Sequence, residues 1–529
     1  MHPSALAKRL YIFLFVIISI FYIYGLGRLP LLGPDEPRYA QVAREMFVRG
    51  DLVTPTLGGH TWFEKPALLY WLMMASFKIF GVNEWGARFG PAICGLLTIA
   101  AVWFVARAIE RSSEEVEGFG FWAALVAASL LGLVVFSRAA SFDVVITMTT
   151  TWALAFFLLH ELKTKQGFLF GFYICVGLSL LAKGLVGIVI PFGVVGFYFL
   201  LRRAWPDKHI WLSLFWGVPL ALAVSALWYG PVIARHGWSF VDEFFIQHHF
   251  ARYVSNKYHH PQPLYFYPAI ILMLALPWTA FFIDSLVKAR RWTWRGADTL
   301  SIVRVFSLAW LALPIVFFSF SGSKLPGYIL PALPAAAFLI VDGFYRSVAK
   351  WSMQATGVIC LALAAGGFVY ALQSRQIPVA CAVLIAAPMA VAASFAILSS
   401  DRARSLLVIF GATALFVLVV LACAAPFVAQ RESVKDLLQL ADARGYANAP
   451  VLAQRSDDRT AQFYAHDRVV YNADGEPITF DEITLEQARA LGPRLVVFIP
   501  AEYVDQFRGA PNLEILGDNG RVAVLGWKP

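Results

Sequence analysis

The sequence predicts an all-α polytopic membrane protein of about 13 transmembrane helices, with a small C-terminal α/β domain outside the cytoplasm. Composition is the first observation: 59% of the 529 residues are hydrophobic and 15% are charged. A soluble domain is usually about 45–50% apolar and about 25% charged. The second observation is the recurrence of apolar runs long enough to cross a bilayer, which takes about 20 residues. The third is a change to mixed composition after residue 428.

Apolar runs account for the predicted spans in order along the chain. They cover residues 10–26, 86–108, 119–137, 144–160, 167–182, 185–201, 210–231, 264–287, 301–320, 327–345, 354–373, 378–398 and 405–428. The first run follows Lys8 and Arg9 and is typical of a signal anchor that is not cleaved. A further run at 66–80 is short and contains Lys78, so we expect it to be juxtamembrane or partly inserted.

Lysine and arginine indicate the orientation. With the N-terminus inside, most of them fall in the predicted cytoplasmic loops, as the positive-inside rule requires. This distribution also explains the net charge of +9 without nucleic-acid binding, which we do not expect. Three long outside segments follow: 27–85, 232–263 and the chain beyond Pro426.

Two domains are predicted. Residues 1–428 form the transmembrane domain, in which 27–85 is a first outside loop with juxtamembrane helices. Residues 429–529 form an α/β domain on the same outer side. Its expected helices are Val434–Ala443 and Leu485–Leu491, and its expected β-rich runs are Arg468–Tyr471, Leu495–Ile499 and Val522–Leu525.

Two charged loops stand out in the first outside segment. One contains Asp35 and Glu36 just before Pro37, and the other contains Glu64 and Lys65. A charge beside a membrane is costly and usually has a task. The alternative for the first loop is helix capping, because proline suits a first turn and an acid before it accepts from free N–H groups. The alternative for the second is a surface ion pair, which contributes about 0–1 kcal/mol.

Asp143 follows Arg138 in a short outside turn and precedes the next span. It is either an N-cap paired with Arg138 or a second carboxylate on the same side of the membrane as Asp35. Shared sidedness permits both aspartates to line one cavity.

Another outside segment contains His248, His249 and Arg252. Adjacent histidines point in different directions on a helix, so the pair alone is a weak metal site, but one of them could join Glu64 around a divalent ion. Arg252 offers a planar fork of donors suited to phosphate.

Lys324 and Tyr328 lie in a third outside turn. Snorkelling of the lysine and an interfacial position of the tyrosine are the alternatives to phosphate binding. Taken together, cations and carboxylates on one predicted side suit a membrane-embedded phosphate ester whose other part is polar.

These segments together resemble a known family. The sequences DEPRY, FEKP, the Asp143 turn, HHFARY and KLPGYILP resemble the ArnT-like lipid A aminoarabinose transferases of the GT-C superfamily, which are related to protein O-mannosyltransferases. The resemblance extends from the first span to about residue 345. It implies inverting transfer of a sugar, most of all 4-amino-4-deoxy-L-arabinose, from undecaprenyl phosphate to lipid A phosphate on the periplasmic face of the inner membrane.

The resemblance also assigns roles to residues. Asp35 and Asp143, with Glu36, would be catalytic; Lys65, Arg252, Tyr328 and Lys324 would bind the donor phosphate; and Glu64, His248 and His249 would hold a metal. A divalent metal ion is the one cofactor it suggests. The implied partners are the polyprenyl-phosphate sugar, lipid A or another glycolipid, and membrane lipids, and we expect a monomer. Pro37 and Gly327 stand where the family usually or often has Thr.

Other functions remain open at this point. A different GT-C glycosyltransferase would use another polyprenyl-phosphate sugar and a protein hydroxyl or other glycolipid as acceptor. A lipid-linked sugar transporter would place polar groups near the bilayer midplane and often shows inverted repeats. We find no repeat, and the polar groups cluster on one predicted side. A sensor whose tail binds a ligand has no motif in its favour.

Overall fold

A computed structural model describes residues 5–163, 165–251, 262–345, 350–374, 377–452, 459–473 and 475–529. The chain divides into two compact units, and each is described here by itself. Unit 1 comprises Met1–Tyr24, Glu64–Leu69 and Pro91–Val419. Unit 2 comprises Gly25–Phe63, Tyr70–Gly90 and Val420–Pro529. Most of the predicted first outside loop, residues 27–63 and 70–85, therefore belongs to the same unit as the C-terminal residues, whereas Glu64–Leu69 belongs to unit 1.

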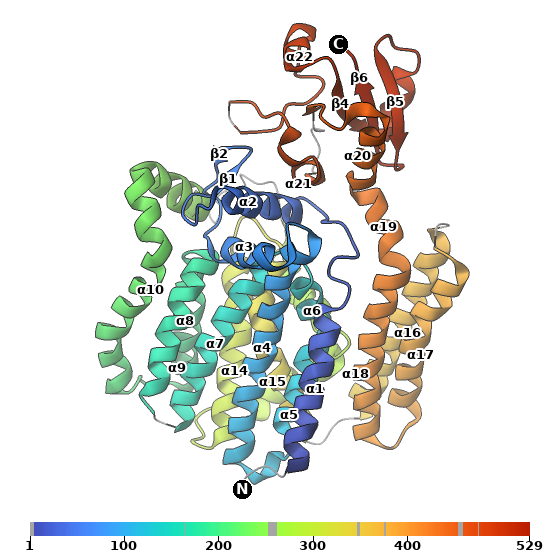
Figure 1. Cartoon of the computed structure of the whole chain (residues 1–529). Coiled ribbons are helices and arrows are strands. Elements are labelled where there is room, and N and C mark those ends of the chain that lie inside the picture. Colours follow the sequence, from blue (N-terminus) through green and yellow to red (C-terminus); the bar gives the residue numbers. More distant parts are fainter. Residues whose placement is uncertain are drawn as a thin grey trace. The chain divides into compact units, whose positions relative to one another are not determined.

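Unit 1 is a bundle of long helices that lie side by side (Figure 1). The α-helices that lie in it are α1 (Ala5–Ile23), α5 (Phe119–Ser129), α6 (Leu131–Ser137), α7 (Phe142–Lys163), α8 (Gly167–Lys183), α9 (Val186–Arg202), α10 (Lys208–Val241), α12 (Phe266–Leu274), α13 (Thr279–Lys288), α14 (Thr299–Ser319), α15 (Leu333–Tyr345), α16 (Lys350–Gln373), α17 (Val379–Leu398) and α18 (Arg402–Val419). A π-helix, η2 (Asp242–Ala251), and a 3-10 helix, η4 (Pro326–Ala332), interrupt the series. Helices α3 (Leu68–Phe80) and α4 (Glu84–Ser112) have residues in both units.

Membrane-spanning helices are confirmed as the main architecture. Within the described residues, eight helices are long and apolar enough to cross a bilayer, or nine if the bent pair α5 and α6 counts as one span. Every predicted apolar run coincides with a helix or a pair of helices, but several of these helices are short, so the count of thirteen stays a prediction. The run at 66–80 forms α3, which is among the shorter apolar helices.

Two predicted spans are broken, and the breaks meet. Helices α5 and α6 bend by 61° at Leu130, and the 264–287 run divides into α12 and α13 around Pro277. Proline has no N–H and cannot continue the helical ladder. The Leu131 N–H donates to the Leu276 carbonyl at 3.0 Å, and the Trp278 indole donates to Ser129 Oγ at 2.9 Å. Each break therefore satisfies polar groups that the other leaves open.

Burial separates central from peripheral helices within unit 1. The most apolar part of η4 and α15 is 89% buried and that of α7 is 78% buried, whereas the value for α16 is 28%. Helices that are apolar all round suit either a bundle core or lipid contact. Helices α7 and α15 are thus the central ones, and both lie next to candidate site residues.

Unit 2 contains helix α2 (Asp35–Arg49), a hairpin and the C-terminal α/β domain. The hairpin strands are β1 (Thr56–Leu57) and β2 (His60–Thr61). The C-terminal helices are α19 (Ala425–Glu432), α20 (Lys435–Ala441), α21 (Thr460–Tyr464) and α22 (Leu485–Leu491), and the strands are β3 (Val451–Leu452), β4 (Leu495–Pro500), β5 (Leu513–Asp518) and β6 (Val522–Trp527). The sheet has the order β3-β4-β6-β5; β3 is parallel to β4, and the other pairs are antiparallel.

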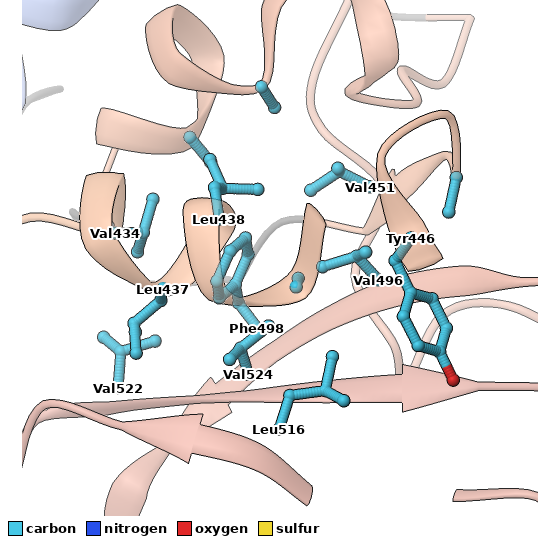
Figure 2. Close-up of a cluster of buried hydrophobic side chains, with 14 of the residues drawn as sticks. Val434, Leu437, Leu438, Tyr446, Val451, Val496, Phe498, Leu516, Val522 and Val524 are labelled. Carbon is cyan, nitrogen blue, oxygen red and sulfur yellow. The ribbon is translucent and has the colours of Figure 1, made fainter. Parts of the chain in front are cut away.

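Strand β4 is buried on both faces of this sheet. Val496 and Phe498 pack against Leu437 and Leu438 of α20 and neighbouring side chains (Figure 2). The alternate residues, including Val497, belong to a second apolar cluster. Successive side chains of a strand point to opposite faces, so a continuous apolar run suits a central strand covered on both sides. This explains why residues 495–499 were recognisable as a strand.

The C-terminal domain was predicted only in part. Helices α20 and α22 and strands β4 and β6 are confirmed. The 468–471 run forms only isolated bridges, through Val469 and Tyr471. Strand β5 was missed because its residues are mostly exposed or half-buried, so its sequence has no clear apolar pattern. Its pairing with β6 also contains an irregularity near Gly517.

Helix α2 packs against α21 of the C-terminal domain within unit 2 (Figure 1). The guanidinium of Arg44 donates to the Phe463 carbonyl at 3.1 Å and to the Asp467 carboxylate at 2.9 Å, and it lies 2.6 Å from His466 Nδ1. Arg44 is 6% exposed. A buried cation that satisfies a helix end in this way fixes the two segments to each other.

The Phe498→Ala variant tests the C-terminal core. We expect a loss of about 3–5 kcal/mol in the free energy of unfolding of the domain, because a buried aromatic leaves a cavity. Denaturant titration of the purified full-length protein, followed by proteolysis within the domain, measures the loss. Tyr503→Ala, at a residue that is 45% exposed, is the control and should change the midpoint little. Equal midpoints for the two variants would contradict the burial of Phe498.

Candidate functional site

The candidate residues fall in both units. Glu64, Lys65, Asp143, Lys324 and Tyr328 belong to unit 1. Asp35 and Glu36 belong to unit 2. His248 and His249 lie in the π-helix η2, but their side chains, and the whole of Arg252, are outside the described residues. The sharing of one pocket by all of these groups stays a prediction.

Asp143 lies at the second residue of α7, where it meets the end of α8. Its carboxylate accepts a hydrogen bond from the ammonium of Lys183, the last residue of α8. The side chains of Asp143 and Lys183 are 18% and 14% exposed. Ser141 Oγ accepts from the Asp143 N–H at 3.1 Å, so the hydroxyl of Ser141 satisfies a backbone donor at the start of the helix. The carboxylate of Asp143 is thereby left for Lys183, and the predicted pairing with Arg138 is wrong, because the guanidinium of Arg138 donates to carbonyls of α1 and the residue after it.

Tyr328 completes this cluster from a third element. It lies in η4, and its ring centroid is 4.5 Å from Lys183 Nζ. A cation over an aromatic face is attracted by the ring quadrupole. We call Asp143, Lys183 and Tyr328 the unit 1 cluster. A carboxylate, an ammonium and a phenol from three separate helices converge there.

Gly327 makes room for this cluster. A Cβ at Gly327 would lie 2.0 Å from Asp143 Oδ2 and 2.7 Å from the Phe136 ring. Since non-bonded atoms cannot approach so closely, the close approach of η4 to α7 requires glycine here. The departure of Gly327 from the residue that the family often has thus has a local packing reason.

Lys324 is buried rather than snorkelling. It is 8% exposed, and its ammonium donates to the Gln262 carbonyl at 2.9 Å. The Tyr267 hydroxyl donates to the Leu325 carbonyl at 3.2 Å and helps to hold the same turn. Lys324 therefore joins its own turn to the segment that contains Gln262, and its role in phosphate binding stays a prediction.

Glu64 and Lys65 form a buried ion pair. Lys65 Nζ donates to the Glu64 carboxylate at 2.8 Å, and the side chains are 14% and 8% exposed. The surface-pair interpretation is therefore wrong. Burial of two charges costs several kcal/mol per ion and is repaid only by good geometry. Glu64 could supply one carboxylate to a metal; among the described residues no group of three potential ligands gathers.

Asp35 and Glu36 lie in the first turn of α2 and do not cap it. The N-cap is Pro34, which makes no side-chain cap bond. The Glu36 carboxylate instead accepts from Arg88 at 2.9 and 2.7 Å and from the Leu32 N–H at 2.9 Å. Asp35 accepts from Arg38 at 2.5 Å, and its side chain is 49% exposed. These contacts favour a structural task for Glu36 and leave Asp35 accessible.

Arg88 holds the loop before α2 with nearly all of its donors. It donates to the carbonyls of Leu26, Leu29 and Pro30 at 2.9, 2.7 and 2.7 Å, in addition to Glu36. Arg88 is 5% exposed. These hydrogen bonds from Arg88 fix the backbone conformation of the loop before α2.

Sequence reasoning did not single out Lys183 or Arg88. Lys183 is a single charge in the short turn between the predicted spans 167–182 and 185–201. Arg88 lies at the start of the predicted span 86–108, and a charge within a span is itself a signal of a partner. Their partners are 40 and 52 residues away along the chain, which no local pattern indicates.

The apolar helices and the buried charge pairs define a polytopic membrane protein. The family model described as "Dolichyl-phosphate-mannose-protein mannosyltransferase" matches residues 64–229. The "Undecaprenyl phosphate-alpha-4-amino-4-deoxy-L-arabinose arabinosyl transferase" of Aeromonas salmonicida is 31% identical over 370 residues, 65% of this chain and 64% of the relative. The protein of the same name from Serratia proteamaculans is 29% identical over 62% of this chain and 58% of its own length.

A solved structure shows the same fold over 98% of the chain. The crystal structure of ArnT from Cupriavidus metallidurans bound to undecaprenyl phosphate has a TM-score of 0.76, 24% sequence identity and 98% coverage of both chains. Its apo form has a TM-score of 0.73. The chain is thus similar in sequence to the curated aminoarabinose transferases and has the fold of the solved ArnT structure. The matched part spans less than two thirds of the length of the curated relatives.

The buried pair of Arg88 and Glu36 is tested by Arg88→Met. We expect a loss of about 3–5 kcal/mol in stability, because the variant leaves a buried carboxylate without its cation. The melting temperature of the purified protein measures it. Arg508→Met removes an arginine whose side chain is 72% exposed and should change little. Combining Arg88→Met with Glu36→Gln should restore part of the loss; no restoration would argue against a direct charge interaction.

Gly327→Ala tests the packing around Asp143. We expect a cost of about 1–3 kcal/mol, because the added methyl displaces the carboxylate or the Phe136 ring. Gly196→Ala is the matched control, since a Cβ there meets nothing within 4 Å. The same melting measurement compares them. A Gly327→Ala protein as stable as the control would mean that η4 does not approach Asp143 this closely.

Proposed function

We propose that this chain is an inverting polyprenyl-phosphate-dependent glycosyltransferase. The proposed donor is 4-amino-4-deoxy-L-arabinose linked to undecaprenyl phosphate, and the proposed acceptor is a phosphate of lipid A. The reaction takes place on the periplasmic face of the bacterial inner membrane. The single observation that carries the proposal is the similarity to aminoarabinose transferases at 31% identity over 370 residues. The convergence of Asp143, Lys183 and Tyr328 supports it independently.

The chemistry needs charge stabilisation more than acid–base work. An acceptor oxygen attacks the anomeric carbon, the bond from that carbon to the donor phosphate breaks, and undecaprenyl phosphate leaves with the electron pair. Negative charge grows on the departing phosphate, and preorganised cations lower the barrier. In our proposal Lys65 and Arg252 stabilise the charge on the departing phosphate, and Tyr328 and Lys324 supply further hydrogen-bond donors to it.

The carboxylates act on the sugar side. Positive character develops at the anomeric carbon as the phosphate leaves, and a nearby carboxylate stabilises it. A lipid A phosphate is already anionic and needs no base, so Asp35 orients the sugar, for instance through its amino group, and catalysis is mostly positioning. A hydroxyl acceptor would need Asp35 as a base. Lys183 orients the Asp143 carboxylate through the hydrogen bond between them.

A metal ion stays a proposal. Glu64 with His248 or His249 offers an oxygen and a nitrogen donor, which suit zinc and several other divalent ions. Metal analysis of the purified protein and of Glu64→Gln addresses it directly.

A second candidate function is transfer of another polyprenyl-phosphate sugar to a protein hydroxyl or to a different glycolipid. The match of residues 64–229 to the mannosyltransferase family model favours it. The two candidates differ in the acceptor and in the need for a base at Asp35.

Site variants test the proposed reaction. Asp35→Asn, Lys65→Ala and Arg252→Ala should each lower transfer about 100-fold or more, because each removes a group that stabilises or orients the reacting centre. The assay uses the purified protein in liposomes with the undecaprenyl-phosphate sugar and lipid A, and mass spectrometry of the lipid A product. Lys78→Ala, at an exposed lysine, is the control.

The outcomes separate the candidates. A mass increase on lipid A supports the first, and an increase on an added protein acceptor but not on lipid A supports the second. Full transfer by Asp35→Asn would refute the assigned role of Asp35. If Asp35→Asn loses transfer to a hydroxyl acceptor but keeps transfer to a phosphate acceptor, Asp35 acts as a base.

A further inference from the structure

The C-terminal domain contacts the segment that leads into Asp35. Within unit 2, α21 lies beside α2, and Arg44 of α2 joins the two as described above. The segment before α2 makes its own contact with the domain. The Tyr464 hydroxyl, at the end of α21, accepts from the Leu31 N–H at 2.7 Å. Leu31 is four residues before Asp35 and is fully buried.

Tyr464 also contacts the start of α4. Its hydroxyl donates to the Glu84 carboxylate at 2.9 Å, and Lys435 of the same domain donates to the same carboxylate oxygen at 2.5 Å. Lys435 Nζ lies 5.5 Å from the centroid of the Tyr464 ring. Burial, and then the charge of Glu84, raise the pKa of Tyr464 well above its usual range, so the phenol keeps its proton and donates it. One phenol thus joins a backbone N–H of the first loop to a carboxylate of α4.

Glu84 and Arg88 lie four residues apart on α4, so they are neighbours on its surface. Arg88 holds the carbonyls of Leu26, Leu29 and Pro30, and Glu36 holds the Leu32 N–H. The loop therefore has fixed points at Leu26, Leu29, Pro30, Leu31 and Leu32. The C-terminal domain supplies the one at Leu31 and clamps the carboxylate next to Arg88.

We propose that the C-terminal domain is a positioning element for the reaction, and that Tyr464 and Lys435 set the placement of Asp35 through Leu31, Glu84 and Arg88. This inference rests on the proposed function for its kinetic consequence. Small displacements of a reacting group are costly in rate even when binding is retained. Neither residue needs to touch the substrates, so both are positioning residues.

Tyr464→Phe tests the proposal because it removes the hydroxyl and keeps the ring. We expect kcat to fall about tenfold, while KM for the undecaprenyl-phosphate sugar stays within about twofold, since misplacement affects the reacting geometry more than binding. In an Asp35→Asn background, Tyr464→Phe should cause no further loss. Lys435→Arg should keep most of the rate that Lys435→Met loses, because it retains the charge beside Glu84.

Tyr446→Phe is the matched control. Tyr446 is a buried tyrosine in the core of the same domain, 1% exposed, and it packs among the side chains of Figure 2. Its loss of a hydroxyl perturbs the domain but not Leu31. It should leave kcat within about twofold.

Hydrogen–deuterium exchange of the full-length protein gives a readout that does not need activity. Tyr464→Phe should speed exchange at Leu31 and Leu32, while the amides of β4 and β6 stay protected. Unchanged exchange at these two residues would overturn the proposal, as would a kcat loss that persists in the Asp35→Asn background or that Tyr446→Phe reproduces. If the wild-type protein transfers no sugar, the proposed function fails, and the exchange data still decide whether Tyr464 orders this loop.

Discussion

The buried pair of Arg88 and Glu36 is the interaction on which the arrangement around Asp35 depends. Removal of an arginine and a glutamate from water costs several kcal/mol for each ion. The structure meets this cost with two bonds between the partners, three loop carbonyls and one N–H. All of these groups belong to the 26–36 segment and α4. Alternative conformations of the loop would leave a buried charge unsatisfied, so the pair selects one conformation.

The same principle applies within unit 1. Lys183 at the end of α8 meets Asp143 at the start of α7, and Lys65 meets Glu64 beside α3. Both pairs are mostly buried. Charges held in this way reorganise little when a reaction moves charge past them, which is the basis of electrostatic catalysis. The buried ion pairs are therefore weak evidence for stability but good evidence for preorganisation. Glycine at position 327 has the complementary task of leaving space for the Asp143 carboxylate.

Sequence reasoning recovered the parts of the molecule that local patterns specify. The apolar runs predicted the helices because the bilayer fixes their length and composition, and strand β4 was recognisable because both of its faces are buried. Contacts between residues that are distant in the sequence could not be predicted in this way. Nothing near Asp143 indicates Lys183 rather than Arg138, and nothing near Leu31 indicates Tyr464. The run 264–287 was predicted as one span, and only the fold shows that it divides near Pro277 and that the Leu131 N–H donates to the Leu276 carbonyl. Exposed strand β5 left no apolar signal.

The separation of partners along the chain has a consequence for how the site is completed. The Leu31 N–H and the Tyr464 hydroxyl are 433 residues apart in sequence, and Lys435 and Glu84 are 351 apart. Loops of this length cost little more to close than loops of half the length, because the closure entropy grows only with the logarithm of length. The bonds form, however, only after the C-terminal domain has been synthesised and has folded. The candidate carboxylates of the first loop are made early and acquire their final surroundings last, so an incomplete chain would carry the DEPRY residues without the contacts that order them.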